Sequence, residues 1–235
     1  MAKIAIDAGY YLYTSGRRCL KSLDPNETKE WILNTRIATI LGDILQEAGH
    51  FVLRVDDVTG ETNVSLINRS ERANEWGADF FVSIQHNLGI KGGIGGGIEV
   101  YVCTDCSDIS MQVQKSIYKA TTEKTRLTGD RHDGTVSANH LVIKNTTMPS
   151  VLIKCGFMDS ETDIRFILDP EFSKAMAEGI AEGICEIFGG KISIPVPTID
   201  EVSEIVKEYE PINDKKSKKI INSFKKFLSR KKRKA

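Results

Sequence analysis

The chain has 235 residues, of which 40% are hydrophobic and 27% are charged. This length can bury one full hydrophobic core and leaves residues for an extension. No segment has the pattern of a membrane span or a secretory signal, because the N-terminus runs directly into the apolar stretch KIAIDAG. The five Cys are an odd number for a disulfide framework and suit a reducing compartment. We therefore expect cytoplasmic synthesis without a signal peptide, with lysis or incorporation in a particle as routes out of the cell.

The formal net charge of zero combines an acidic body with a basic tail. Residues 215–235 contain 11 Lys or Arg and no acid, whereas residues 1–214 carry 21 basic and 32 acidic side chains. Before the basic tail lie two prolines, in ISIPVPT (192–198), and then an acidic stretch. These shifts predict an α/β domain over 1–190, a Pro-containing acidic linker over 191–213, and a basic amphipathic tail over 214–235.

Strand-like and helix-like segments alternate along the body. Short apolar runs predict strands at 3–8, 51–55, 79–84, 97–103, 140–144 and 150–154. Helical patterns fall at 26–48, 65–76, 107–124 and 171–188. The alternation predicts an α/β fold, with a mixed, mostly parallel sheet and helices on both faces. Asp24, Pro25 and Glu27 resemble the start of a helix, which would place Glu30 in its second turn.

Several polar residues fall where predicted strands end. Asp7 lies near the end of the first strand and Tyr10 just beyond it, Gln85 follows the third, and Lys154 ends the last. Ligands of open α/β sheets bind at the carboxyl ends of strands. We therefore expect these side chains to share one cleft.

Three segments carry a family resemblance, namely IAIDAGYYLYTSGRR (4–18), FVSIQHN (81–87) and VLIKCGFMDS (151–160). Together with pieces between them, they resemble the family 3 N-acetylmuramoyl-L-alanine amidases of bacteria and clostridial phage endolysins, over roughly residues 3–189. In that family the motifs read DAGHG, then SIHHN or SIHAN, and then a strand that ends in Glu before Gly-Phe. The resemblance implies zinc ligands at Tyr10, Glu30 and Gln85 and a catalytic Glu at Lys154, so that only Glu30 keeps the family residue.

The substituted residues do not suit zinc catalysis. A catalytic zinc takes three ligands from His, Cys, Asp or Glu and keeps one place for water. Tyr10 would bind a metal only as a phenolate, Gln85 offers a neutral amide oxygen, and the Lys154 ammonium is no general base near neutral pH. His86 follows Gln85, so the alternation of a strand would turn it away from the cleft. We expect no working catalytic residues and no cofactor, with zinc only if the chain is an active amidase.

Two interpretations of the substitutions remain open, drift after loss of function and a new structural role. In the second, Lys154 supplies the cation that Glu30 would otherwise lack, and Tyr10 and Gln85 donate hydrogen bonds to Glu30.

Contacts with a ligand can outlast catalysis. By resemblance, Asn87, Arg69 and Asn139 flank the peptidoglycan cleft, although Asn and Arg side chains also cap turns and helices.

The basic tail is a separate functional feature. Its apolar residues recur at helical spacing, at Ile220, Ile221, Phe224, Phe227 and Leu228. Such a helix can contact an anionic membrane, an anionic wall polymer or an acidic protein surface.

The sequence favours an inactive amidase-like protein that binds peptidoglycan or a wall-associated or phage protein, of phage or prophage origin. The alternatives are an active zinc-dependent N-acetylmuramoyl-L-alanine amidase of the endolysin type, and a structural component of a phage-like particle.

Overall fold

The computed structural model describes residues 1–129 and 134–192, which belong to the first structural unit of the chain, Met1–Ser193. The strands in this part are β1 (Lys3–Ala8), β2 (Phe51–Arg54), β3 (Phe80–Asn87), β4 (Ile98–Val102), β5 (Thr135–Ser137) and β6 (Ser150–Phe157). Its helices are α1 (Glu30–Glu47), α2 (Leu66–Trp76), α3 (Asp108–Thr125), α4 (Leu141–Lys144), α5 (Ile164–Ile167) and α6 (Pro170–Phe188).

The strands form one sheet in the order β2-β1-β3-β6-β4-β5. Neighbouring strands are parallel, except that β4 and β6 are antiparallel. This confirms the predicted mixed, mostly parallel sheet. The chain leaves β1 for β2 on one side and later returns to β3 on the other, so the strand order reverses beside β1. In open α/β sheets, this reversal opens a crevice at the carboxyl ends of the strands.

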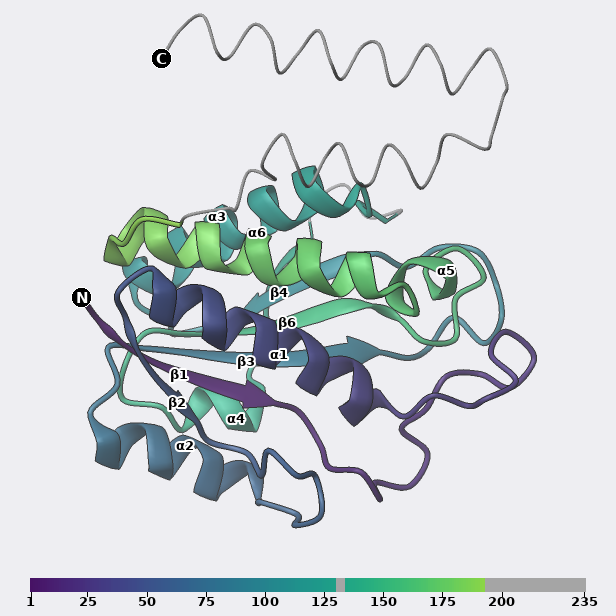
Figure 1. Cartoon of the computed structure of the whole chain (residues 1–235), viewed down its shortest axis with the longest axis horizontal. Coiled ribbons are helices and arrows are strands. Elements are labelled where there is room, and N and C mark those ends of the chain that lie inside the picture. Colours follow the sequence, from purple (N-terminus) through teal and green to yellow (C-terminus); the bar gives the residue numbers. More distant parts are fainter. Residues whose placement is uncertain (130–133, 193–235) are drawn as a thin grey trace, which may run out of the picture. The chain divides into compact units, whose positions relative to one another are not determined.

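Helices cover both faces of the sheet, as predicted. Figure 1 shows α1, α3 and α6 over one face and α2 and α4 over the other. Successive residues of β3 alternate between the two layers: Phe80, Val82 and Ile84 enter the larger core, and Phe81 enters the smaller one. The strand is therefore apolar on both sides, which explains its nearly continuous run of hydrophobic residues.

Two glycines allow α6 to approach α3 closely. A Cβ built on Gly179 would lie 2.7 Å from Thr121 Cα, and one built on Gly183 would lie 2.6 Å from Ile117 Cα. The two glycines are four residues apart and therefore lie on one face of α6.

The start of α1 differs from the prediction. The helix begins at Glu30, with Lys29 as its N-cap residue, so Glu30 is its first residue and does not lie in a second turn. Asp24 instead closes a local turn, in which its carboxylate accepts the N–H groups of Asn26 and Thr28 at 3.1 and 2.7 Å. An Asp followed by Pro favours such a turn as well as a helix start.

The predicted strand at 140–144 was also wrong. Residues Leu141–Lys144 form α4, and the His140 carbonyl accepts the N–H groups of Ile143 and Lys144. A short apolar run does not distinguish a strand from one buried helical turn. The short elements β5 and α5 were not predicted, while β3 and β6 extend three residues beyond the predicted ends at 84 and 154.

Candidate functional site

The loop after β1 is held by a buried ion pair. The Arg69 guanidinium contacts Asp7 Oδ1 at 2.5 Å and donates to the carbonyls of Ala8 and Tyr10, each at 2.6 Å. The Ser83 hydroxyl donates to the other Asp7 oxygen at 2.6 Å. Burial raises the pKa of Asp7, and Arg69 opposes that rise. Tyr10 follows with a left-handed backbone, at a φ of 69°, so these bonds fix the loop that carries its ring.

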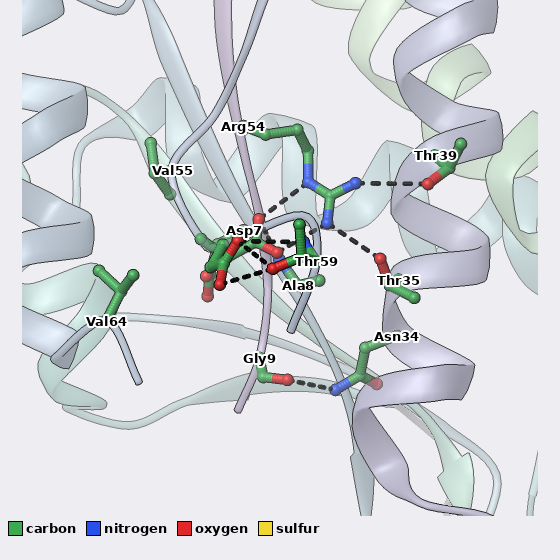
Figure 2. Close-up of polar contacts among 12 residues, drawn as sticks. Asp7, Ala8, Gly9, Asn34, Thr35, Thr39, Arg54, Val55, Thr59 and Val64 are labelled. Carbon is green, nitrogen blue, oxygen red and sulfur yellow. Dashed lines mark hydrogen bonds and ion pairs between the residues drawn. The ribbon is translucent and has the colours of Figure 1, made fainter. Parts of the chain in front are cut away.

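Helix α1 is fixed to the strand ends by its first turns. Asn34 donates from Nδ2 to the Gly9 carbonyl at 3.0 Å, as Figure 2 shows, while its Oδ1 lies 2.8 Å from His86 Nδ1. Arg54 of β2 points to Thr35 and Thr39 of α1 in the same view, with bonds of 3.2 and 3.4 Å. The first residue of α1 is thereby positioned beside the ends of β1 and β3.

Glu30 is fully buried at this position. Its Oε1 accepts the His86 backbone N–H at 2.9 Å, and its Oε2 lies 3.7 Å from the Arg17 guanidinium. Burial raises the pKa of Glu30, and the nearby Lys154 ammonium is the strongest influence against that rise. The Arg17 guanidinium also lies 4.5 Å from the centre of the Tyr10 ring, which is within the range of a cation–π contact.

Gln85 and Lys154 lie opposite each other on the neighbouring strands β3 and β6. Lys154 Nζ donates to Gln85 Oε1 at 2.7 Å and to the His86 carbonyl at 3.3 Å. Burial lowers the pKa of Lys154, while the Glu30 carboxylate acts to raise it. The hypothesis that Tyr10 and Gln85 donate to Glu30 is wrong, because the His86 backbone donates to it. Of the cations, Arg17 lies within ion-pair distance of Glu30, and the expected cation Lys154 acts on the Glu30 charge from farther away.

His86 faces α1 and not the side occupied by Gln85. Its side chain is fully buried, and burial, aided by Lys154, lowers its pKa to about 3. Within residues 1–129 and 134–192 its Nε2 has no hydrogen-bond partner. The register of β3 and β6 shifts between Gln85 and Asn87, yet this irregularity does not turn the imidazole toward Gln85.

A pocket of about 190 Å³ lies where these residues meet. The structure brings together three of the predicted site residues in its wall, which is formed by Tyr10, Arg17, Leu66, Gln85, His140, Leu141, Val142, Leu152 and Lys154. Glu30 is not part of this wall and lies behind it, in contact with Arg17.

The three residues expected along a substrate cleft lie outside that wall. Arg69 has 1% of its surface exposed, and its guanidinium bonds to Asp7, to the β1 loop and to the Val64 carbonyl. Asn87 donates to Glu99 at 2.9 Å, and Asn139, on a loop, accepts the Thr104 N–H at 3.2 Å. Both side chains therefore have partners within the domain.

Sequence reasoning missed Arg17 and Asn34. Arg17 is one of two consecutive arginines in a loop, and nothing local distinguishes it from Arg18. Asn34 had a usable signal, because it follows Glu30 by four residues and so lies on the same face of α1.

Known proteins resemble this chain in sequence. Residues 4–186 match the N-acetylmuramoyl-L-alanine amidase family known as family 3. The chain belongs to this family. It is 31% identical to the sporulation-specific N-acetylmuramoyl-L-alanine amidase of Bacillus subtilis, over 81% of this chain and 70% of that protein. It is 36% identical to the endolysin of Bacillus phage SPP1, over 54% of this chain and 46% of that protein.

A solved structure shares the fold. The N-acetylmuramoyl-L-alanine amidase of Clostridium difficile 630 superposes with a TM-score of 0.71 at 26% sequence identity, covering 81% of this chain and 98% of that structure. The family resemblance of the three motifs thus extends to the whole α/β domain.

The side chains at the family's zinc positions do not fit a zinc ion. Burial, followed by the Glu30 charge, raises the pKa of Tyr10, which keeps the phenol protonated. Gln85 Oε1 is a neutral oxygen, which is a weak ligand for zinc, and it already accepts a hydrogen bond from Lys154. The Lys154 ammonium beside it would repel a dication. Among residues 1–129 and 134–192, no three His, Cys, Asp or Glu side chains form a group that could hold a metal.

Within the described residues, no helix combines the length and hydrophobicity that a membrane crossing requires. The predicted tail residues Ile220, Ile221, Phe224, Phe227 and Leu228 lie outside the residues that the structure describes.

Proposed function

We propose that this chain is an inactive member of the amidase family, which binds peptidoglycan or a wall-associated protein partner without zinc-dependent hydrolysis. The observation that carries the proposal is the 2.7 Å bond between Lys154 and Gln85. A zinc ligand position and the catalytic position of the family are here bonded to each other. The Gln85 oxygen is occupied by this bond and is not free to bind zinc, and the Lys154 ammonium cannot accept a proton from water.

The retained fold supports the binding part of the proposal. The pocket, the β1 loop and the ends of β3 and β6 form one connected arrangement, in which polar groups are bonded within the site. Most of the residues that line this pocket are not among the substituted ones. Relatives are named as a sporulation-specific N-acetylmuramoyl-L-alanine amidase, an endolysin and a probable cell wall amidase, which makes peptidoglycan the ligand to test first.

The names of these relatives also favour a second function, namely working N-acetylmuramoyl-L-alanine amidase activity. If this function is correct, the chain hydrolyses the amide bond with a set of groups other than the family's zinc site.

Hydrolysis and binding are best tested together on purified cell walls. The wild-type chain is compared with Tyr10→His/Gln85→His/Lys154→Glu, which restores the family residues beside Glu30. The left-handed backbone at position 10 accepts His better than most residues. The proposal predicts that the wild type sediments with walls and releases no peptide, while the triple variant binds zinc and releases peptide.

A fourth substitution provides the control. Adding Glu30→Gln to the triple variant removes the one carboxylate of the restored ligand set and is expected to abolish zinc binding and peptide release. Peptide release by the wild type that is lost in its own Lys154→Met variant would establish the amidase alternative. Failure of the wild type to sediment with walls would leave a protein partner as the ligand.

A further inference from the structure

The pocket beside Lys154 has the composition of a binding site for a small anion. Two cationic side chains, Arg17 and Lys154, line it, and among the described residues no Asp or Glu side chain is part of its wall. Its volume of about 190 Å³ is below the range of about 300–1,000 Å³ that is typical of pockets for drug-sized ligands. The pocket therefore admits a chemical group of a few heavy atoms and not a large part of a polymer.

Among the described residues, the buried Lys154 ammonium has no anionic partner at contact distance. Its exposed fraction is 7%, and both of its hydrogen-bond acceptors, Gln85 Oε1 and the His86 carbonyl, are neutral. Within residues 1–129 and 134–192, no carboxylate oxygen lies within 4.0 Å of Nζ and no acceptor takes its third N–H. A buried ammonium is costly without a paired charge, and an anion in the pocket would pair with it.

Arg17 presents a second cation at the same pocket. Its side chain is 33% exposed, with the guanidinium 3.7 Å from Glu30 and stacked over the Tyr10 ring. A separation of 3.7 Å is longer than a hydrogen bond, so the planar donors of Arg17 are available to a ligand. Its backbone is fixed, because the Arg17 carbonyl accepts the Glu30 N–H at 3.0 Å.

The surroundings favour a monoanion with an apolar body. The rest of the wall includes Leu66, Leu141, Val142 and Leu152. Two carboxylates outside the wall, Glu30 and Glu99, act on the Lys154 charge and would oppose a second negative charge. An aliphatic carboxylate satisfies both conditions, whereas a phosphate dianion satisfies neither.

We propose that the pocket between Arg17 and Lys154 binds a carboxylate group, held by both cations, with its aliphatic neighbour against the leucine and valine side chains. The carboxylate comes from a small molecule or from the C-terminus of a peptide. The proposal rests on the proposed function only in its peptide source, since wall peptides carry carboxylates.

The test is a titration of the full chain, followed by calorimetry or by amide NMR shifts. The probes are acetate, inorganic phosphate, N-acetyl-Ala-Ala with a free carboxyl group, and the same dipeptide as its C-terminal amide. We expect the free dipeptide to bind at least about tenfold more tightly than its amide, as loss of a charge-assisted hydrogen bond predicts. Equal affinities of the two dipeptides, or tighter binding of phosphate, would overturn the proposal.

Variants locate the binding. Arg17→Gln and Lys154→Met are each expected to weaken the binding of the free dipeptide by about tenfold or more. Arg18→Gln is the matched control, because Arg18 is the next residue, carries the same charge and pairs with Glu27 outside the pocket; it should stay within about twofold. Equal weakening by Arg17→Gln and Arg18→Gln would reduce the effect to general surface charge and reject the site. Arg17 is partly exposed, so its variant keeps the test valid if Lys154→Met does not fold.

The same variants separate this proposal from the wall-binding function. If the dipeptide binds in the pocket but walls do not sediment the chain, the carboxylate site stands and the wall function fails. If walls sediment wild type and Arg17→Gln equally and the dipeptide does not bind, the wall function stands and the carboxylate site fails.

Discussion

Lys154 and Gln85 form a 2.7 Å hydrogen bond across the pair of strands β6 and β3. Both side chains are at least nine-tenths buried, each with 7% of its surface exposed. The bond therefore joins a charged donor to a neutral acceptor in a region with little water, where hydrogen bonds are strong and unpaired groups are costly.

A double-mutant cycle measures this bond. Gln85→Leu, Lys154→Met and the double variant are compared by urea unfolding. We expect a coupling energy of about 1.5–3 kcal/mol, the range for hydrogen bonds to charged groups. Each single variant leaves one buried polar group without its partner, whereas the double variant leaves neither.

An exposed lysine gives the control cycle. Lys174 is exposed and lies on α6, which covers the sheet face opposite to that covered by α2 and α4 (Figure 1). Gln85→Leu and Lys174→Met should therefore be additive within about 0.5 kcal/mol. Additivity in the Lys154 cycle as well would mean that the bond contributes nothing to stability.

The sequence predicted the architecture because hydrophobic periodicity persists along β1, β3 and the long helices. The carboxyl ends of parallel strands meet at one edge, so the proximity of Tyr10, Gln85 and Lys154 followed from the order of elements. Local signals were less reliable. The Asp24 turn and the α4 turn each have sequences that suit two conformations, and long-range packing selects one of them.

The contacts inside the site could not be predicted. Whether Lys154 reaches Glu30 or Gln85 depends on side-chain distances that a strand pattern does not specify. Arg17 comes from an irregular loop, whose path depends on the bond between its carbonyl and the first N–H of α1. The substitutions themselves were visible in the motifs, but their new partners required coordinates.

Arg69→Met tests the buried pair that holds the β1 loop. The variant leaves the Asp7 carboxylate buried without its 2.5 Å partner, and loss of one member of a buried pair costs about 3–5 kcal/mol. Urea unfolding measures the loss. Arg165→Met removes an exposed guanidinium and should change stability by less than about 0.5 kcal/mol. Similar values for the two variants would show that the Asp7–Arg69 pair does not support the domain.

The close approach of α3 and α6 predicts an unusual effect of alanine. In most helix interiors Gly→Ala stabilises by about 0.5–1 kcal/mol. At Gly183 the new Cβ would lie 2.6 Å from Ile117 Cα, so the helices must separate, and we expect a net loss of about 1–3 kcal/mol. Gly42 of α1 is the matched control, because a Cβ there meets no atom closer than 3.8 Å. Stabilisation by both Gly183→Ala and Gly42→Ala, measured by thermal unfolding, would contradict the predicted clash.

His86 predicts a component of acid sensitivity. Its pKa falls to about 3 in the folded chain from an ordinary value of 6.5, so below pH 6.5 the unfolded chain binds a proton that the folded chain does not. The native state is therefore destabilised as the pH falls from 6.5 toward 3, by up to about 1.4 kcal/mol per pH unit. In His86→Gln this component is absent, while the backbone bond to Glu30 can still form. Urea unfolding between pH 4.5 and pH 7.5 should show a steeper loss in the wild type than in the variant. Parallel profiles would mean that His86 titrates alike in the folded and unfolded chains. That result would contradict the complete burial of His86 against Asn34.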